Sequence, residues 1–286
     1  MISGETKVYG IIGNPIAHTM SPPMHNAAFK ELELNCIYVP FLVEEAGLVH
    51  AIEGMRAMDI KGLNVTMPHK LAIVPLLDHL DPLAEKIGAV NTVVNKSGIL
   101  TGYNTDATGF IKALLDNCIY TQGQRVVVLG AGGVSRAICF ALAEKKYEIC
   151  IVNRTYTKAL KLANEVSNMF NKDIEAYEMN EKNLQSILSE ANILVNATSV
   201  GMDSTIEKTP VAAALLSSEL VVFDTIYCPI ETKLLKSAKN NGAKVIGGLD
   251  MLLWQGAIAF KLWTGLEAPF DTMKKEVSSI LGLHED

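Results

Sequence analysis

Four polar clusters stand out in the first part of the chain, each at the end of an apolar segment. They are "HTMSPPMHN" (18–26), "NVTMPHK" (64–70), "AVNT" (89–92) and "GYNTDATG" (102–109). Hydroxyl, amide, ammonium and carboxylate groups of this kind hold small polyhydroxylated ligands and move their protons. Because ligands bind beyond the ends of strands in parallel or mixed sheets, we expect the clusters to form one polar pocket.

Each cluster also has a local structural explanation. Ser21 could serve merely as a helix cap, Thr66 could merely precede a turn, and Asn91 could merely hydrogen-bond to the backbone. The occurrence of four such clusters in a chain that also carries a cofactor-binding pattern favours the pocket.

That cofactor pattern is the glycine turn Gly130-Ala131-Gly132-Gly133, which follows "RVVVL" and opens a helical segment. Glycines let the backbone turn tightly and approach a pyrophosphate, whose charge the helix N-terminus stabilises. Ser135 stands at the third small position of the usual pattern, which still permits close packing of helix and strand. The turn therefore predicts a dinucleotide site.

The next strand indicates which dinucleotide is bound. NAD enzymes place an acidic residue about 20 positions further on, to bond the ribose 2′-hydroxyl. This chain has Asn153-Arg154-Thr155 there, with Lys158 one turn later. A guanidinium binds a 2′-phosphate through charge-assisted hydrogen bonds, so the residues favour NADP. A solvated helix start is the alternative for Arg154 and Lys158, but cations are not preferred there.

The elements that must position these residues follow from the apolar periodicity. In the first part we expect strands at 7–13, 36–43 and 62–66, helices at 21–34 and 44–58, and a hairpin of 90–95 with 99–104 around Lys96-Ser97-Gly98. From about 108, strands at 125–133, 148–153, 192–198 and 220–227 alternate with helices at 134–146 and 155–170, and two long helices follow at 249–265 and 270–282. This order predicts an α/β protein with two α/β domains.

We expect residues 1–107 to form a substrate-binding domain and 108–248 a Rossmann-type, doubly wound, parallel-sheet NADP domain. Residues 249–286 then return as helices to the first domain.

Composition narrows the class of function. The net charge is −6, from 31 acidic and 25 basic residues, which argues against general binding to nucleic acids or membrane surfaces. The five cysteines are scattered and the six histidines lack metal-ligand spacing, so we expect neither disulfides nor a metal site. The N-terminal residues lack a signal-peptide core and no segment approaches the length of a membrane helix, so we expect a cytoplasmic protein. We also expect a monomer or a homodimer.

Taken together, the motifs resemble the shikimate/quinate dehydrogenase family, essentially from end to end. The matching segments are "SPPMHN", "NVTMPHK", "GAVNTV", "GYNTDATG", "GAGGVSRA", "NRTYTKA", "NATSVGM", "DTIYCPIET" and "GLDMLLWQGA". The resemblance implies the reversible NADP-linked reduction of 3-dehydroshikimate to shikimate, a step of aromatic amino-acid biosynthesis that leads to chorismate.

The resemblance also implies roles for individual residues. Lys70 and Asp106 correspond to the catalytic pair, in which an ammonium donates a proton to the forming alkoxide and stabilises its charge. The implied substrate contacts are Thr19, Ser21, Thr66, Lys70, Asn91, Asp106, Tyr227 and Gln255. The implied cofactor contacts are Gly130, Ala131, Gly132, Gly133, Asn153, Arg154, Thr155, Lys158, Thr198, Ser199, Gly201, Met202, Ile226, Gly248 and Met251.

One departure from the family pattern matters. Most relatives have serine where this chain has Thr19, and the extra methyl narrows the substrate pocket beside this residue. Whether the pocket selects shikimate over the bulkier quinate is therefore left open. Besides a quinate-preferring enzyme, the alternatives are a generic NADP reductase and a sensor that binds NADP without catalysis. Small polar residues in place of a broad apolar pocket count against the reductase, and the retained Lys70 and Asp106 count against the sensor.

Overall fold

The computed structural model describes residues 2–119 and 123–283. Contacts within the chain divide it into two compact units. Unit 1 comprises Met1–Asp106 and Leu253–Asp286, and unit 2 comprises Ala107–Leu252. Two helices run across the boundaries, α4 (Thr105–Asp116) near the first and α9 (Gly248–Thr264) at the second.

Unit 1 is built on a six-stranded mixed sheet. Its strands lie in the order β2 (Cys36–Leu42), β1 (Lys7–Gly13), β3 (Gly62–Val65), β5 (Thr92–Lys96), β6 (Ile99–Tyr103) and β4 (His79–Leu80). β1 pairs in parallel with β2 and β3, and β5 is antiparallel to β3 and β6. The antiparallel pairing brings the start of β5 and the end of β6 together with the end of β3, where three of the four polar clusters lie.

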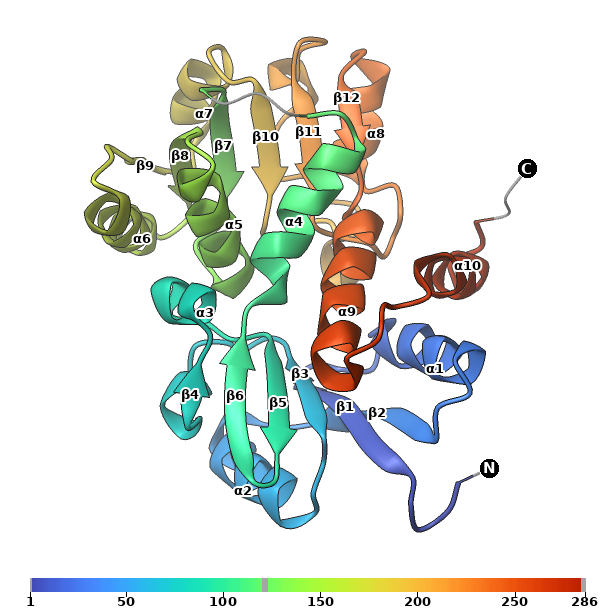
Figure 1. The fold of residues 1–286 in the computed structure, drawn as a ribbon. Coiled ribbons are helices and arrows are strands. Elements are labelled where there is room, and N and C mark those ends of the chain that lie inside the picture. The colour runs from blue at the N-terminus through green and yellow to red at the C-terminus, as the bar shows by residue number, and fades with distance from the viewer. Residues whose placement is uncertain (1, 120–122, 284–286) are drawn as a thin grey trace. The chain divides into compact units, whose positions relative to one another are not determined.

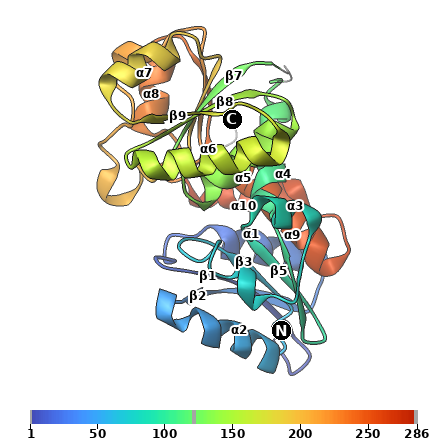
Figure 2. The same ribbon diagram turned by 90° about the vertical axis from the view of Figure 1, so that its left-hand side faces the viewer.

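Side chains of β1 alternate between the two faces of this sheet, as period-2 burial requires. Ile12 packs in a core with Ile52 and Met55 of α2 (Leu48–Ala57). On the other face Tyr9 contacts Phe29 of α1 (Ser21–Glu31) and Trp263 of α9, at 5.3 Å between ring centroids in each case. Helix α10 (Phe270–Ile280) packs against α1, and Figure 2 shows α1 and α2 on opposite sides of β1 and β2. The last part of the chain therefore completes the core of unit 1.

Unit 2 is a parallel sheet of six strands, β12 (Lys244–Ile246), β11 (Val221–Asp224), β10 (Ile193–Asn196), β7 (Arg125–Leu129), β8 (Glu148–Asn153) and β9 (Glu175–Glu178), in that order. The strand order reverses between β7 and β10, which is the Rossmann arrangement with its ligand-binding switch point. α4 and α5 (Gly133–Glu144) cover one face, and α7 (Glu181–Leu188) and α8 (Lys233–Asn240) cover the other (Figures 1 and 2). α6 (Tyr156–Phe170) packs on β8 and β9. The predicted fold class is confirmed.

Several element boundaries differ from the sequence prediction. Helix α1 ends at Glu31 rather than at 34, because Glu33 adopts a left-handed conformation with φ 52°. The expected helix 44–58 is a 3₁₀ turn at Glu45–Gly47 followed by α2. Lys96 pairs with Ile99, so the hairpin turn is Ser97-Gly98 alone, with φ 54° and 86°. Positive φ at both central residues is the geometry that suits a tight β-hairpin.

Short elements were not predicted at all. They are β4, β9, β12, α7, α8, α3 (Pro82–Ile87) and the 3₁₀ turns at Val74–Leu76, Asp203–Thr205 and Ala213–Leu215. Within residues 2–119 and 123–283, no helix combines the length and the apolar character that a membrane span requires.

Candidate active site

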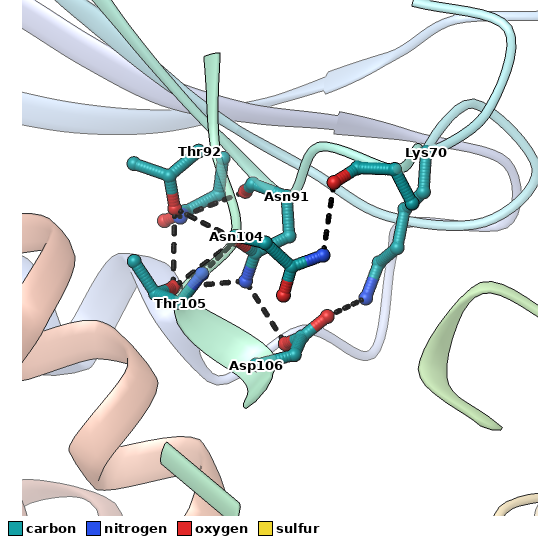
Figure 3. A network of polar contacts seen from close by, with 8 residues as sticks. Lys70, Asn91, Thr92, Asn104, Thr105 and Asp106 are labelled. Carbon is teal, nitrogen blue, oxygen red and sulfur yellow. Dashed lines mark hydrogen bonds and ion pairs between the residues drawn. The ribbon is translucent and has the colours of Figure 1, made fainter. Parts of the chain in front are cut away.

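The centre of the candidate site is a buried ion pair in unit 1. Nζ of Lys70 lies 2.5 Å from Oδ2 of Asp106, and the two side chains are only 11% and 8% exposed. Lys70 follows β3, and Asp106 lies in the first turn of α4, where the helix dipole stabilises a negative charge. Figure 3 shows the two side chains pointing toward each other. Water screens such a pair far less than a surface pair, so each charge depends strongly on the other.

A second group holds the carboxylate from the other side. Nδ2 of Asn91 donates hydrogen bonds to Oδ1 of Asp106 and to Oγ1 of Thr105, both at 2.9 Å. Oδ1 of Asn91 accepts the backbone N–H of Thr105 at 2.7 Å. Both oxygens of Asp106 are therefore bonded, one to the ammonium and one to an amide donor, and the carboxylate has a fixed orientation (Figure 3).

The backbone that carries Lys70 is also fixed. The carbonyl of Lys70 accepts the N–H of Val90 at 2.8 Å, which ties this loop to the start of β5. The ring of His69 is buried and bonds through Nε2 to the carbonyl of Val43 at 2.7 Å. Because a carbonyl only accepts, Nε2 carries the proton. Rigid support of this kind keeps the ammonium of Lys70 in place.

Three hydroxyl groups that we expected at the substrate lie in unit 1. Met20, not Ser21, precedes helix α1 and there is no capping hydrogen bond, so the alternative explanation of Ser21 as a helix cap is wrong. Thr19 Oγ1 instead accepts the N–H of Ser21 at 3.3 Å. Within the described part of the chain, the hydroxyls of Ser21 and Thr66 have no hydrogen-bond partner, which leaves both able to bind a ligand.

The other expected substrate contacts differ in their surroundings. The amide of Asn91 already uses its donors and its acceptor inside the protein, so contact with a ring hydroxyl would have to share them. Gln255 lies on the part of α9 that belongs to unit 1 and is buried, whereas Tyr227 is half-buried and belongs to unit 2.

In unit 2 the glycine turn has the geometry that a dinucleotide requires. Gly130 has φ 110°, and a Cβ there would lie 2.9 Å from the carbonyl oxygen of Ala197, so only glycine fits. A Cβ at Gly132 would meet nothing within 4 Å, which leaves open space beside the N-terminus of α5. The first turn of a helix has N–H groups without intrahelical partners, and these bind phosphate. The turn therefore fits the pyrophosphate of NADP.

The end of β8 carries exposed positive charge. Arg154 and Lys158 are exposed, and neither forms an ion pair with any described residue. Thr155 is exposed too, and its carbonyl accepts Nδ2 of Asn153 at 3.0 Å. Two cations that have no partner in the described residues suit a 2′-phosphate. This end of the strand therefore fits NADP as well.

The remaining expected cofactor residues surround a buried network that the sequence analysis missed. Asp224 is fully buried, which raises the pKa of its carboxyl to about 6. It accepts hydrogen bonds from Thr232 Oγ1 at 2.7 Å and Asn196 Nδ2 at 3.0 Å. Oδ1 of Asn196 in turn accepts the N–H and the hydroxyl of Thr198. The network fixes the start of the loop that contains Thr198, Ser199, Gly201 and Met202.

Two of the expected cofactor residues are packed inside unit 2. Ile226 and Met251 are buried. A Cβ at Gly248 would lie 2.3 Å from the carbonyl oxygen of Thr225, so glycine is required there for packing whether or not it touches a ligand.

The sequence analysis also missed polar residues beneath the ion pair. Asn64, Thr92 and Thr105 belong to the polar clusters but were not assigned to the site, and all three are buried in a strand or at a helix start. A polar side chain inside an otherwise apolar strand was the available signal, because buried polar groups need partners. No group of three or more His, Cys, Asp or Glu side chains in the described ranges is arranged to hold a metal ion.

Comparison with protein families matches the chain in three segments. Residues 11–93 match the shikimate dehydrogenase substrate binding domain, 114–242 match shikimate / quinate 5-dehydrogenase, and 248–277 match the shikimate 5′-dehydrogenase C-terminal domain. The matched segments follow the same order as the motifs identified in the sequence.

Individual relatives match over nearly the whole length. The shikimate dehydrogenase (NADP(+)) of Dehalococcoides mccartyi, strain BAV1, is 42% identical over 278 residues, which is 97% of each protein. A shikimate dehydrogenase crystallised with NADP+ is 43% identical, with a TM-score of 0.92 over 98% of both chains. The enzyme of Thermus thermophilus, in complex with NADP(H) and shikimate, is 38% identical, with a TM-score of 0.85 over 96% of this chain and 99% of the other. The predicted resemblance is confirmed, and the chain belongs to the shikimate dehydrogenase family.

Proposed function

We propose that this protein catalyses the reversible NADP-linked reduction of 3-dehydroshikimate to shikimate, with Lys70 as its principal acid and base. It is an oxidoreductase of a family whose curated relatives are named shikimate dehydrogenase (NADP(+)). The observation that carries the proposal for this chain is the buried pair of Lys70 and Asp106, 2.5 Å apart.

The chemistry requires a proton for the oxygen of the ketone while its carbon receives a hydride, which NADPH supplies when it is bound. In our proposal Nζ of Lys70 donates this proton and its positive charge stabilises the forming alkoxide. In the reverse direction Lys70 withdraws the proton from the hydroxyl. An ammonium with little exposure keeps its donor direction, because few water molecules compete for it.

Asp106 orients that ammonium in the proposed mechanism. Its Oδ2 is bonded to Lys70 and its Oδ1 to Asn91, so the carboxylate is fixed in position. From there it can accept a further hydrogen bond from a substrate hydroxyl. Carboxylates have several lone-pair sites and accept more than one donor. The same group can therefore hold the lysine and select a substrate with adjacent hydroxyls.

Thr19, Ser21 and Thr66 bind the rest of the substrate in this proposal. Hydroxyl donors suit a carboxylate, and those of Ser21 and Thr66 have no competing partner in the described residues. Tyr227 and Gln255 complete the proposed contacts on the basis of the motifs. The family comparison supports the acid as a ligand, since a related enzyme was crystallised with shikimate.

The proposal for the cofactor site rests on three features of unit 2. The glycine turn and the start of α5 bind the pyrophosphate, and Arg154 with Lys158 binds the 2′-phosphate. The loop from Thr198 to Met202, held by Asn196, contacts the nicotinamide end together with Ile226, Gly248 and Met251. NADP is the expected partner because the relatives use it and because the end of β8 offers cations.

The test follows the absorbance of NADPH while the concentrations of shikimate and NADP are varied, with quinate and NAD as controls. Shikimate with NADP should give the highest kcat/KM of the four combinations. Preference for quinate with NAD would reassign the protein to quinate oxidation. Binding of NADP without turnover of either acid would favour the non-catalytic sensor.

The proposal also covers the cellular location and the oligomeric state of the protein. We expect a cytoplasmic protein that is a monomer or a homodimer. Cell fractionation and analytical ultracentrifugation of the purified chain test these two points.

A further inference from the structure

A line of hydrogen bonds leads from the pair of Lys70 and Asp106 into the core of unit 1. The donor and the acceptor of each bond in this line are fixed. Asn91 must turn Oδ1 toward Thr105, because the backbone N–H there can only donate. Nδ2 of Asn91 therefore always faces Oδ1 of Asp106. The amide cannot flip without placing its oxygen against the carboxylate.

The amide of Asn64, the next residue inward, has a fixed orientation for the same reason. Nδ2 of Asn64 donates to the backbone carbonyl of Asn91 at 3.2 Å and to Oγ1 of Thr92 at 3.1 Å. The carbonyl can only accept, so Oδ1 of Asn64 is turned the other way. It accepts the hydroxyl of Tyr38 at 2.7 Å. Tyr38 must therefore be the donor of this bond.

Tyr38 is itself held firmly. Its ring stacks on that of His25, at 4.5 Å between centroids and 18° between planes. The side chain of Asn26 accepts the N–H of Tyr38 and donates to its carbonyl, both at 2.8 Å. His25 and Asn26 belong to the cluster "SPPMHN", and no substrate or cofactor role accounts for them. Their contacts fix the tyrosine at the inner end of the line.

We infer that Tyr38 is a positioning residue for the proposed reaction, and that it acts through Asn64 and Asn91 on Asp106 and Lys70. The inference rests on the proposed function. Each donor in the line polarises the next, so the loss of one bond weakens those that follow. Without the hydroxyl, the oxygen of Asn64 is buried and unpartnered, and Asn64 cannot flip because of the Asn91 carbonyl. Asn64 then shifts, and the backbone that carries Asn91 shifts with it.

The test compares Tyr38→Phe with Tyr9→Phe. Tyr9 pairs with Tyr38 across β1 and β2 and contacts the same Trp263, and its hydroxyl has no hydrogen-bond partner within the described residues. Tyr38→Phe should lower kcat by about three- to tenfold, the size of one hydrogen bond, while the KM for shikimate stays unchanged. Tyr9→Phe should leave both constants at the wild-type values. Thr92→Val keeps the shape of the side chain but removes the hydroxyl that bonds to Asn64, Asn91 and Thr105, and it should also lower kcat.

A double-mutant cycle separates positioning from a general effect on the fold. In an Asp106→Asn background, Tyr38→Phe should have no further effect on kcat, because the group through which it acts has been changed. Multiplicative effects of the two changes would overturn the inference, as would wild-type kcat in Tyr38→Phe. If the wild-type protein itself fails to oxidise shikimate with NADP, the proposed function fails, and the inference that rests on it fails with it.

Discussion

Lys70 and Asp106 are 36 positions apart in the chain, yet their side chains form the most buried Lys–Asp ion pair among the described residues. Lys61 and Asp59 form another Lys–Asp pair in unit 1, but their side chains are 32% and 61% exposed. Exposed pairs contribute little to stability or to chemistry, because water and salt screen them. The contrast gives a matched control for the proposed catalytic role of Lys70.

Lys70→Ala should lower kcat by about 10²- to 10⁴-fold with little change in the KM for shikimate, because the loss removes a proton donor used in the transition state. Lys61→Ala removes the same group from a pair that is exposed and should keep wild-type rates. Since Lys70→Ala leaves a buried carboxylate without its cation, urea unfolding should accompany the kinetics. Near-normal turnover in a folded Lys70→Ala protein would remove Lys70 from the mechanism.

Arg154→Gln should raise the KM for NADP by about 10- to 100-fold, because it removes the charge-assisted bonds to the 2′-phosphate. The KM for NAD should change little, since NAD has a hydroxyl at that position. Lys161 is an exposed lysine of α6, the helix that begins just after Arg154, and it lies further from the helix start, so Lys161→Gln is the matched control. Equal changes in the KM for NADP and for NAD would show that Arg154 does not bind the 2′-phosphate.

The fold was predictable where burial and periodicity agree. The run 125–129 is apolar after Arg125 because β7 is buried on both faces, and the sequence pattern shows this directly. Helix α3 has six residues, too few for periodicity to reveal it, although Asp81 caps it and Gly88 ends it with φ 66°. Short elements of this kind depend on tertiary packing more than on pattern.

The site was predictable only in part, for a related reason. The motifs identified Lys70, Asp106 and Asn91. The support from Asn64 depends on the register of β3 against β5, in which Asn64 lies opposite Thr92. Register follows from which face each strand buries, and the short strand 62–65 is buried on both faces, so its sequence does not define one.

His25 should make the protein less stable as the pH falls. Burial in an aromatic cluster lowers the pKa of His25 from 6.5 to about 3. Below pH 6.5 the unfolded chain therefore takes up a proton that the folded chain does not, and stability falls until the pH reaches about 3. The slope of this contribution is about 1.4 kcal/mol per pH unit.

Urea unfolding of wild type and His25→Asn between about pH 7 and about pH 4.5 measures that contribution. The wild type should lose stability with falling pH more steeply than the variant. His50→Asn is the control, because the side chain of His50 is 84% exposed, and its pH dependence should match that of the wild type. Parallel curves for wild type and His25→Asn would show that folding does not lower the pKa of His25.

Asp224 should make the protein less stable as the pH rises, which is the opposite of the effect of His25. Burial raises the pKa of its carboxyl from 3.8 to about 6, so the folded protein holds the proton more tightly than the unfolded chain does. Stability therefore falls as the pH rises from about 4 to about 6, by roughly 3 kcal/mol, and the full loss persists above that range. Asp224→Asn removes this dependence, so the stability difference between wild type and variant should shrink over the same range.

The control for this change is Asp173→Asn, because Asp173 is exposed. Urea unfolding of the three proteins across the same pH range makes the comparison. A constant difference between wild type and Asp224→Asn would mean that the three donors from Thr232, Ile226 and Asn196 keep the carboxylate ionised despite its burial.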